Sequence, residues 1–442
     1  MSARIPLLRG FRAGSLLEWG SPGGVPLERF IGSARALAAR LPRRRHVLNL
    51  CEDRYRFLLG FAAALIAGQV TLMPPSRAPE ALRRIRFQYR DSYCVAGDES
   101  APDGMESVRI GLEDESAALE PAIPEIAAAQ DAAILFTSGT TGQPAAHSKS
   151  WGSLCAGADA LTDCLGLSPQ SPCAILGTVP SQHMFGLETT VMLPLQGGCA
   201  THRGRPLLPA DVAAAAQSAP HPVWLMTTPL QLNACVRELA SVPGLAGVIS
   251  STMPLSPALA REVESRWRVP VHEIYGCTEI GMIALRRPAR EEAWTLSPDL
   301  EMWQEDGATW VGGARAVRPY APADRISLLA PRRFVLEGRT GDVVKIAGKR
   351  SSIGVLNAEL ASIEGVEDGA FFLPEAAPGR ERLVAFVVAP GLSESSILEA
   401  LRARVDPVFL PRPLYLVEAL PRDSNGKLPR ANLESLARRF TA

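Results

Sequence analysis

One loop in this sequence combines small hydroxyl side chains with glycine. It spans residues 137–144 and directly follows the apolar, strand-like residues 134–136. Glycine lets the backbone approach a ligand closely, and backbone N–H groups together with hydroxyl donors suit phosphate oxygens. A polar surface turn is the alternative interpretation. We predict a phosphate-binding loop with contacts from the following residues: Thr137, Ser138, Gly139, Thr140, Thr141 and Gly142.

A second segment whose side chains could take part in chemistry covers residues 275–281 and follows a short apolar run. Glu279, beside Thr278, can hold Mg²⁺ and a phosphate oxygen, because carboxylate oxygens are ligands that this hard cation prefers. Tyr275 next to Gly276 offers an aromatic face on which adenine can stack. A structural tyrosine and a solvated glutamate are the alternative interpretation.

The third segment is a turn rich in Asp, Asn and Gly that carries Lys427. Only four of the 46 basic residues are lysine, namely Lys149, Lys345, Lys349 and Lys427. The others are arginine, whose planar guanidinium does not replace a compact ammonium. A lysine at a loop tip is usually solvated, but in a chain that prefers arginine we interpret Lys427 as a functional residue.

Composition and missing motifs exclude several classes of protein. The chain has 442 residues, 47% of them hydrophobic and 21% charged, which is typical of a globular enzyme and not of a disordered or fibrous chain. Its 46 basic and 46 acidic residues balance, so the bulk charge favours neither nucleic acid nor an anionic membrane. GxGxxG, GxxxxGK[ST] and GxSxG motifs are absent, and the six histidines are isolated, without metal-ligand spacing.

The cysteines and apolar segments suggest where the protein works. The eight cysteines form no CxxC pair, which predicts buried, reduced thiols of a cytoplasmic protein. The N-terminus lacks the layout of a signal peptide. The apolar residues 57–73 are interrupted by glycine and polar residues, which predicts a buried helix running into a strand instead of a membrane span. We therefore expect a soluble, cytoplasmic protein.

The elements that must position these segments alternate along the chain. Short β-branched runs at residues 132–136, 223–226 and 247–249 are separated by Ala/Leu-rich helical stretches. This alternation predicts an α/β fold of layered helices and largely parallel sheets. The acidic, polar stretch 97–120 is predicted to be a connecting loop.

The last hundred residues predict a compact α+β unit. Its elements are expected as strands at 343–346, 383–388 and 414–417, and as helices at 356–363 and after a cap formed by Ser395 and Ser396. We place the boundary near residues 338–342, which gives an N-terminal domain of residues 1–338 and a C-terminal domain of residues 339–442.

In this order, the three segments resemble those of the adenylate-forming superfamily, which includes acyl-CoA synthetases, peptide-synthetase adenylation domains and luciferases. The resemblance spans residues 48–433. Residues 179–187 look like the acyl-pocket motif, residues 250–256 like the adenine-side loop, and residues 338–348 like the hinge segment. Asp324, fourteen positions before the hinge segment, matches the ribose-binding aspartate.

The resemblance implies a two-step reaction on a two-domain α/β fold. A carboxylate attacks the α-phosphate of Mg·ATP to give acyl-AMP and pyrophosphate. The pantetheine thiol of CoA, or of a phosphopantetheinyl acyl carrier protein, then displaces AMP and forms a thioester. Between the steps the small C-terminal domain is expected to swing about Gly341 and Asp342. The expected partners are a small carboxylic acid and CoA or a carrier protein, with no nucleic acid.

The resemblance also implies roles for individual residues. The catalytic residues would be Lys427, Thr278, Glu279 and His183, with Lys427 bridging carboxylate and phosphate and Glu279 binding Mg²⁺. ATP would further contact Ser251, Thr252, Met253, Pro254, Tyr275, Gly276, Asp324 and Arg339. The substrate pocket would be formed by His183, Phe185, Gly186, Ser250, Cys277 and Met282, with Met184 beside them.

The sequence departs from the family pattern at the phosphate loop. Relatives usually continue Pro-Lys-Gly, whereas Pro144 is followed here by Ala145 and Ala146. The lysine on the pyrophosphate side is therefore missing. His147 or Lys149 replaces it, or both are structural. The usual hinge Asp or Lys falls on Gly341, whose backbone freedom suits a pivot.

The identity of the acid depends on the pocket motif. Amino-acid-activating relatives place an aspartate where this chain has His183, and Glu188 is expected to lie elsewhere, so an α-amino acid is disfavoured. Residues 142–151 resemble those of stand-alone ligases of bacterial aryl polyene (xanthomonadin-type) pigment clusters, which implies a hydroxybenzoate-like aryl acid and a carrier-protein acceptor. A ligase for medium-chain fatty or hydroxy acids, a catalytically silent carboxylate- or nucleotide-binding homologue, and a luciferase-like oxygenase are the alternatives.

Overall fold

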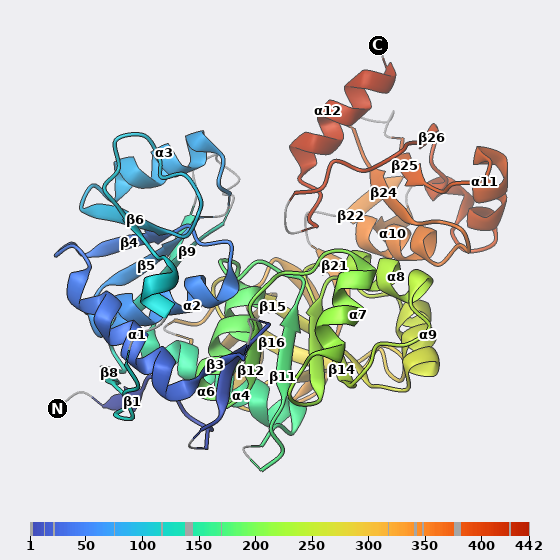
Figure 1. Ribbon diagram of the computed structural model, residues 1–442. Helices are drawn as coiled ribbons and strands as arrows, with labels where there is room; N and C mark the ends of the chain where they lie inside the picture. The colour runs from blue at the N-terminus through green and yellow to red at the C-terminus, as the bar shows by residue number, and fades with distance from the viewer. Residues whose placement is uncertain are drawn as a thin grey trace.

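The computed structural model is a mixed α/β structure, shown in Figure 1. It describes residues 3–12, 14–20, 23–74, 76–115, 118–137, 145–168, 170–316, 318–339, 343–346, 349–374, 382–423 and 426–441. The N-terminal and central parts of the chain form two large sheets with helices around them. The predicted α/β fold class is thereby confirmed.

The first sheet contains six strands among the described residues. In spatial order they are β10 (Ala145–Ser150), β9 (Asp131–Thr137), β5 (Val70–Met73), β4 (His46–Asn49), β6 (Ser92–Ala96) and β7 (Ser107–Arg109). All neighbouring strands are parallel except β10 and β9. In sequence, the predicted phosphate loop lies between β9 and β10, and these two strands pair antiparallel.

Three helices accompany this sheet. They are α1 (Leu27–Arg40), α2 (Arg54–Ile66) and α3 (Pro79–Gln88). Helix α2 is buried along almost its whole length and runs through a short turn into β5, as predicted from its apolar sequence. Its first turn is capped by Asp53, whose side chain accepts a hydrogen bond from the backbone N–H of Arg56.

The second sheet contains eleven strands among the described residues. In spatial order they are β20 (Asp324–Ala330), β21 (Arg333–Arg339), β17 (Trp294–Leu296), β16 (Gly281–Arg286), β15 (Val271–Cys277), β14 (Leu245–Ser250), β13 (Val223–Thr227), β11 (Ala174–Gly177), β12 (Ala200–His202), β2 (Leu16–Trp19) and β3 (Val25–Pro26). The stretch from β15 to β2 is parallel, and both ends are antiparallel. The predicted strands at 132–136, 223–226 and 247–249 are β9, β13 and β14.

The remaining elements of this part pack around the sheets. They are β1 (Arg4–Pro6), β8 (Glu125–Ala127), the 3₁₀ helix η1 (Leu112–Glu115), α4 (Trp151–Leu165), α5 (Met184–Gly186), the π-helix η2 (Leu187–Met192), α6 (Leu193–Gln196), α7 (Pro209–Gln217), α8 (Pro229–Glu238), α9 (Pro257–Trp267), β18 (Leu300–Glu305) and β19 (Ala308–Gly313). One hydrophobic cluster joins α1, α2, α4 and η2 to strands of both sheets. This cluster therefore binds the two sheets together.

The C-terminal part forms a separate group of elements, drawn in orange and red in Figure 1. They are β22 (Val343–Ile346), β23 (Lys349–Ser352), α10 (Ile353–Ala361), β24 (Asp368–Phe372), β25 (Val384–Val388), α11 (Glu394–Arg402), the 3₁₀ helix η4 (Pro407–Phe409), β26 (Leu414–Leu416) and α12 (Arg430–Thr441). Two hydrophobic clusters consist only of residues from this part. An ion pair between Arg237 on α8 and Glu367 joins it to the rest of the chain.

Some local predictions need correction. The stretch 97–120 is not only a loop, because it contains β7 and η1. The N-cap of helix α11 is Ser393 and not Ser395, whereas Ser396 takes part in the cap as predicted. The Ser393 hydroxyl accepts from the N–H of Ser396, and the Ser396 hydroxyl accepts from the N–H of Ser393. This reciprocal arrangement is a capping box, in which each serine satisfies one free backbone N–H of the first turn.

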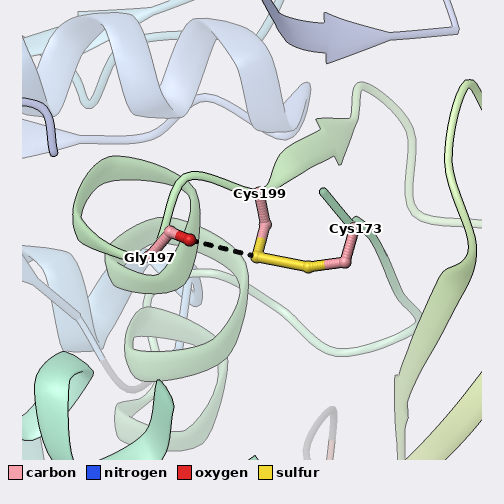
Figure 2. Close-up of a disulfide and its surroundings, with 3 residues drawn as sticks. All are labelled: Cys173, Gly197 and Cys199. Carbon is pink, nitrogen blue, oxygen red and sulfur yellow. Dashed lines mark hydrogen bonds between the residues drawn. A yellow bond between two sulfur atoms is a disulfide. The ribbon is translucent and has the colours of Figure 1, made fainter. Parts of the chain in front are cut away.

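The prediction that all cysteines are reduced thiols is wrong for Cys173 and Cys199, which form a disulfide (Figure 2). The register of the sheet explains the pair. Strands β11 and β12 are parallel with Ala174 opposite Ala200, so the residues before them face each other, with their Cα atoms 5.0 Å apart. The other six cysteines are free thiols. Among the described helices, none is both long and apolar enough to cross a membrane.

Candidate functional site

The Glu279 turn, defined as residues 278–280, connects the antiparallel strands β15 and β16. Both flanking glycines are required by close contacts. A Cβ on Gly276 would overlap the backbone of Gly281. A Cβ on Gly281, whose φ is +96°, would overlap the carboxylate of Glu188. Only glycine fits at these two positions, and its small size lets the turn pack closely against its surroundings.

Three side chains surround the carboxylate of Glu279. The imidazole Nε2 of His147 lies 3.7 Å from Glu279 Oε1. Burial and then the nearby Glu279 charge raise the pKa of Cys277 to about 12 and that of Tyr320 to about 12, so both side chains lie close to Glu279. Sequence reasoning missed Tyr320, since a tyrosine in an irregular segment carries no recognisable signal.

The ligands that Glu279 and its neighbours offer determine which metal ion the site could hold. No group of three or more His, Cys, Asp or Glu side chains suited to a metal is found in the described part of the chain. Glu279 is one carboxylate with 26% of its side chain exposed. A single carboxylate fits Mg²⁺, which is commonly held by one or two carboxylates together with substrate phosphates.

Lys149 lies beneath the Glu279 turn and not in solvent. Only 5% of the residue is exposed, and its ammonium donates a hydrogen bond to the backbone carbonyl of Glu279. Burial lowers the pKa of Lys149, and the carboxylate of Glu188 opposes this shift. Lys149 and His147 are the two candidates to replace the missing loop lysine. Lys149 bonds the backbone carbonyl of Glu279, whereas His147 lies next to the Glu279 carboxylate.

Glu188 was expected to lie away from the pocket, but the structure places it next to the predicted pocket residue Met282. Both of its carboxylate oxygens accept from the backbone N–H of Met282, at 3.0 and 3.1 Å. Its charge is paired with Arg315, 3.8 Å away, and Arg315 is paired with Asp299 at 2.9 Å. The sequence contained no signal for this buried network, since Glu188 lies 94 positions from Met282 and its charged partner Arg315 comes from a different segment again.

Tyr275 and Asp324 are joined directly. The Tyr275 hydroxyl donates to Asp324 Oδ2 at 2.7 Å, and the tyrosine ring packs against Trp294 and Phe334. Asp324 opens strand β20 and lies opposite Arg339 at the end of β21, which explains the fourteen-residue spacing of the motif as a β-hairpin. The fold thus brings the predicted adenine and ribose residues together.

The predicted adenine-side loop follows strand β14. Thr252 has a φ of +80°, which is strained for a β-branched residue. The hydroxyl oxygens of Ser250 and Thr252 are buried and have no hydrogen-bond partner among the described residues. Ser251 is satisfied by the carbonyl of Ile274, 3.0 Å away, and Pro254 is exposed. Strain and unsatisfied buried hydroxyls in one loop are typical of a ligand-binding segment.

The lysine segment is anchored to the C-terminal sheet. Arg422 forms a paired contact with Asp368 on β24, and the N–H of Lys427 donates to Asp423 Oδ1 at 2.9 Å. The Lys427 side chain is exposed. The ion pair thus holds the turn that presents this lysine.

This segment lies against the N-terminal part of the site. A Cβ on Gly426 would lie 3.8 Å from the sulfur of Met253, in the adenine-side loop. Burial, followed by the charges of Lys427 and Arg205, lowers the pKa of His183 to about 4. His183 is therefore a neutral imidazole near neutral pH, and its Nε2 has no partner within the described ranges.

The residues predicted to line the substrate pocket belong to three hydrophobic clusters. Phe185 and Met282 belong to one buried cluster, whereas Met184 and Cys277 pack against two others. Gly186 is required, since a Cβ there would overlap the carbonyl of Pro180. The lining of the acyl pocket by these residues stays a prediction.

Several predicted residues cannot be placed. The following ones lie outside the described residues: Ser138, Gly139, Thr140, Thr141, Gly142, Gly341 and Asp342. Thr137 ends β9 and Arg339 ends β21, but only their backbones are described. Thr278, in contrast, lies in the Glu279 turn itself and is half-buried.

Comparison with known proteins identifies similar chains. The model of the family described as "AMP-binding enzyme" matches residues 33–300. The 4-coumarate–CoA ligase of Rhodobacter capsulatus is 33% identical over 299 residues, covering 67% of this chain and 74% of that protein. The 3-hydroxybenzoate–CoA/4-hydroxybenzoate–CoA ligase of Thauera aromatica is 23% identical over 396 residues, covering 77% and 73%.

A solved structure supports the overall architecture. The o-succinylbenzoate CoA synthetase of Bacillus subtilis, in complex with its acyl-adenylate intermediate, superimposes with a TM-score of 0.80. The alignment covers 98% of both chains, at 17% sequence identity. At this identity the similarity establishes the fold alone.

Proposed function

This chain belongs to the AMP-binding enzyme family, as an AMP-forming acid–CoA ligase, and from that premise we propose that it activates a hydroxybenzoate-like aryl acid at the site around Glu279, Asp324 and Lys427. The ATP-dependent ligase activity follows from family membership. The acid, the acceptor and the roles of the residues are the proposal.

One observation carries the residue assignment. The turn with Lys427 comes from the C-terminal part, yet Gly426 approaches Met253 and the Lys427 charge acts on His183. The turn that carries this cation thus lies near Met253 and His183, which belong to the segments proposed to bind the nucleotide and the acid. This arrangement suits a step in which a carboxylate and a phosphate must be brought together despite their like charges.

In the first step, a carboxylate oxygen of the acid forms a bond to the α-phosphorus of ATP and the bond to pyrophosphate breaks. Lys427 would hold the carboxylate and the phosphate oxygen, offsetting the negative charge that accumulates there. Asp324, oriented by Tyr275, would accept hydrogen bonds from the ribose hydroxyls. Glu279 and Thr278 would hold Mg²⁺ and the α-phosphate, and the metal when bound supplies Lewis-acid charge compensation.

In the second step, a thiol sulfur bonds to the acyl carbon, AMP leaves, and the thiol proton passes to solvent. We propose that the C-terminal part, from β22 onward, moves as a unit about Gly341 and Asp342 between the steps, relative to the part of the chain that ends with β21 at Arg339. The two hydrophobic clusters confined to the C-terminal part support such a unit. Motion would withdraw Lys427 once the adenylate has formed.

An aryl acid is favoured over an α-amino acid by charge. An α-ammonium group needs a carboxylate partner in the pocket, and at the corresponding position the chain has the neutral His183. Glu188 is already engaged by Arg315 and the N–H of Met282. The unpartnered Nε2 of His183 suits a polar group of the acid. Relatives named for 4-coumarate and hydroxybenzoate activation agree with this class.

The test is acid-dependent ATP–pyrophosphate exchange with 4-hydroxybenzoate, 3-hydroxybenzoate, 4-coumarate, octanoate and several amino acids. Exchange with the aryl acids supports the proposal. Exchange with octanoate alone keeps the mechanism and rejects the aryl assignment. No exchange with any acid, despite ATP binding, favours a silent carboxylate- or nucleotide-binding protein.

The acceptor needs a separate assay. The resemblance to pigment-cluster ligases leads us to propose a phosphopantetheinyl carrier protein as acceptor, with CoA as the simpler alternative. Thioester formation measured with both acceptors at equal concentration distinguishes them. Faster transfer to CoA than to the carrier protein would reject the pigment-cluster assignment.

The Tyr275–Asp324 hydrogen bond leads to a prediction about ATP affinity. Tyr275→Phe keeps the ring but removes the donor, and a hydrogen bond to a charged group contributes about 1.5–3 kcal/mol. We therefore expect the Kd of ATP to rise at least about tenfold. Calorimetric titration with ATP and with 3′-deoxy-ATP measures this.

The deoxy analogue serves as the control for that prediction. In the wild type it should bind more weakly than ATP, and Asp324→Asn should reduce the difference. Equal affinities of wild type and Tyr275→Phe for ATP would show that the hydroxyl does not orient Asp324 for the ribose.

A further inference from the structure

One face of strand β10 contacts the Glu279 turn at two points. His147 and Lys149 are two residues apart, so they point to the same side of the strand. His147 approaches the carboxylate of Glu279, and Lys149 donates to the backbone carbonyl of the same residue. The strand that begins directly after the phosphate loop in sequence is thus connected to both the side chain and the backbone of Glu279.

Lys149 lies near the buried charges of Glu188 and Arg315. Arg315 pairs with Glu188 and with the partly exposed Asp299, so this group of four holds two positive and two negative charges. Lys149, Glu188 and Arg315 are each at most 5% exposed. Burying charge is costly unless each charge is paired. A lysine kept in such a position is therefore held in one place by its hydrogen bond to the turn, with the opposite charge of Glu188 nearby.

The same group also holds the other end of the turn. Glu188 accepts from the N–H of Met282, and Arg315 donates to the carbonyl of Met282. Glu188 sits within the π-helix η2, a rare form that occurs mostly at functional sites. Lys149 thus holds the backbone of Glu279, and Glu188 and Arg315 hold the backbone of Met282.

We propose that Lys149 is a positioning residue that holds the Glu279 turn in register with β10, and thereby fixes the position of the Glu279 carboxylate. The proposal rests on the proposed function, because it assigns Glu279 to the Mg²⁺ of bound ATP. Lys149 acts through the turn and does not touch the nucleotide. In this chain, a buried lysine under the turn accompanies the replacement of the usual loop lysine by Ala145.

The central variant is Lys149→Met, which keeps the length of the side chain and removes the charge and the donor. Loss of a group that orients a metal ligand typically costs about tenfold to a hundredfold in metal affinity or activity. We expect the Mg²⁺ concentration for half-maximal ATP binding to rise by about that factor. Binding of AMP without metal should change less than about twofold, since Tyr275 and Asp324 are untouched.

Two further variants separate positioning from a structural role. Arg287→Met is the matched control: it removes a half-buried cation that directly follows β16 and is paired with Glu264 on α9, away from the turn. It should lower the melting temperature and leave the Mg²⁺ dependence unchanged. The double variant Lys149→Met/Glu188→Gln removes one charge of each sign, so the buried group stays neutral. It should regain thermal stability lost in Lys149→Met without regaining Mg²⁺ affinity.

The experiment is calorimetric titration of each folded variant with ATP at several Mg²⁺ concentrations and with AMP in EDTA, alongside thermal unfolding. The proposal is overturned when Lys149→Met changes the Mg²⁺ dependence of ATP binding no more than Arg287→Met does. It is also overturned when Lys149→Met weakens AMP binding as much as Mg·ATP binding, or when the double variant regains both thermal stability and Mg²⁺ affinity. None of these titrations needs an acid substrate. If the wild type binds Mg·ATP but catalyses pyrophosphate exchange with no acid, the proposed function is contradicted. The titrations still test the positioning role of Lys149 in that case.

Discussion

Lys427→Ala should lower acid-dependent ATP–pyrophosphate exchange by about a hundredfold to a thousandfold, which is the usual cost of removing one preorganised electrostatic contact from a reacting centre. The side chain is exposed, so its loss should not destabilise the fold. Its turn is held by Arg422 and Asp368, both of which remain. Exchange assays on wild type and variant, with melting temperatures measured in parallel, test this prediction.

The two half-reactions provide a control within the same variant. Lys427→Ala should convert chemically prepared acyl-AMP to thioester at close to the wild-type rate, since Lys427 is proposed to act only in adenylation. Arg438→Ala, which removes another exposed cation of the C-terminal part, should leave both half-reactions unchanged. Equal losses in both half-reactions of Lys427→Ala would place the lysine outside the adenylation step.

Gly281→Ala is the second substitution expected to have a large effect. Gly281 has a φ of +96°, and its added methyl group would overlap the Glu188 carboxylate that bonds the N–H of Met282. Backbone strain and overpacking each cost about 1–3 kcal/mol, so we expect a loss of about 2–6 kcal/mol in the free energy of unfolding. Displacement of Glu188 should also move Glu279 and lower exchange. Urea denaturation and the exchange assay measure both effects.

Gly307→Ala provides the matched control for backbone strain. Gly307 lies in the turn between β18 and β19 with a φ of +75°, and nothing lies within 4 Å of an added Cβ. It should cost only about 1 kcal/mol, the lower end of the range for a non-glycine residue at positive φ. If the two glycine variants are equally stable and active, Glu188 is not packed against the turn as described.

The sequence was sufficient to predict elements whose cause is local. Residues 57–73 were recognised as a helix followed by a strand because their apolar character, interrupted by glycine, is contained in one segment. The strands at β13 and β14 were found from short β-branched runs. Local patterns are less reliable where equivalent residues lie close together: Ser393, Ser395 and Ser396 are all suited to cap α11 by residue type, and the structure uses Ser393 with Ser396.

For the candidate site, the order of motifs identified the residues but not their contacts. Lys427, Glu279, Tyr275 and Asp324 were selected from residue type and motif, and the fold joins Tyr275 to Asp324 by a hydrogen bond. Tyr320 gave no signal, because nothing in its neighbouring residues indicates that its hydroxyl meets Glu279. Glu188 was assigned elsewhere, because its partner Met282 is 94 positions away.

By itself, then, the sequence determined the family, the alternation of elements and the set of residues suited to phosphate and carboxylate chemistry. Only the tertiary structure decided which of those residues meet. Lys149 and Glu279 are 130 positions apart, and their contact depends on the packing of β10 against a hairpin of the other sheet. The disulfide of Cys173 and Cys199 likewise follows from the register of two parallel strands. Backbone preference acts within a few residues, whereas burial and charge pairing act between segments that only folding brings together.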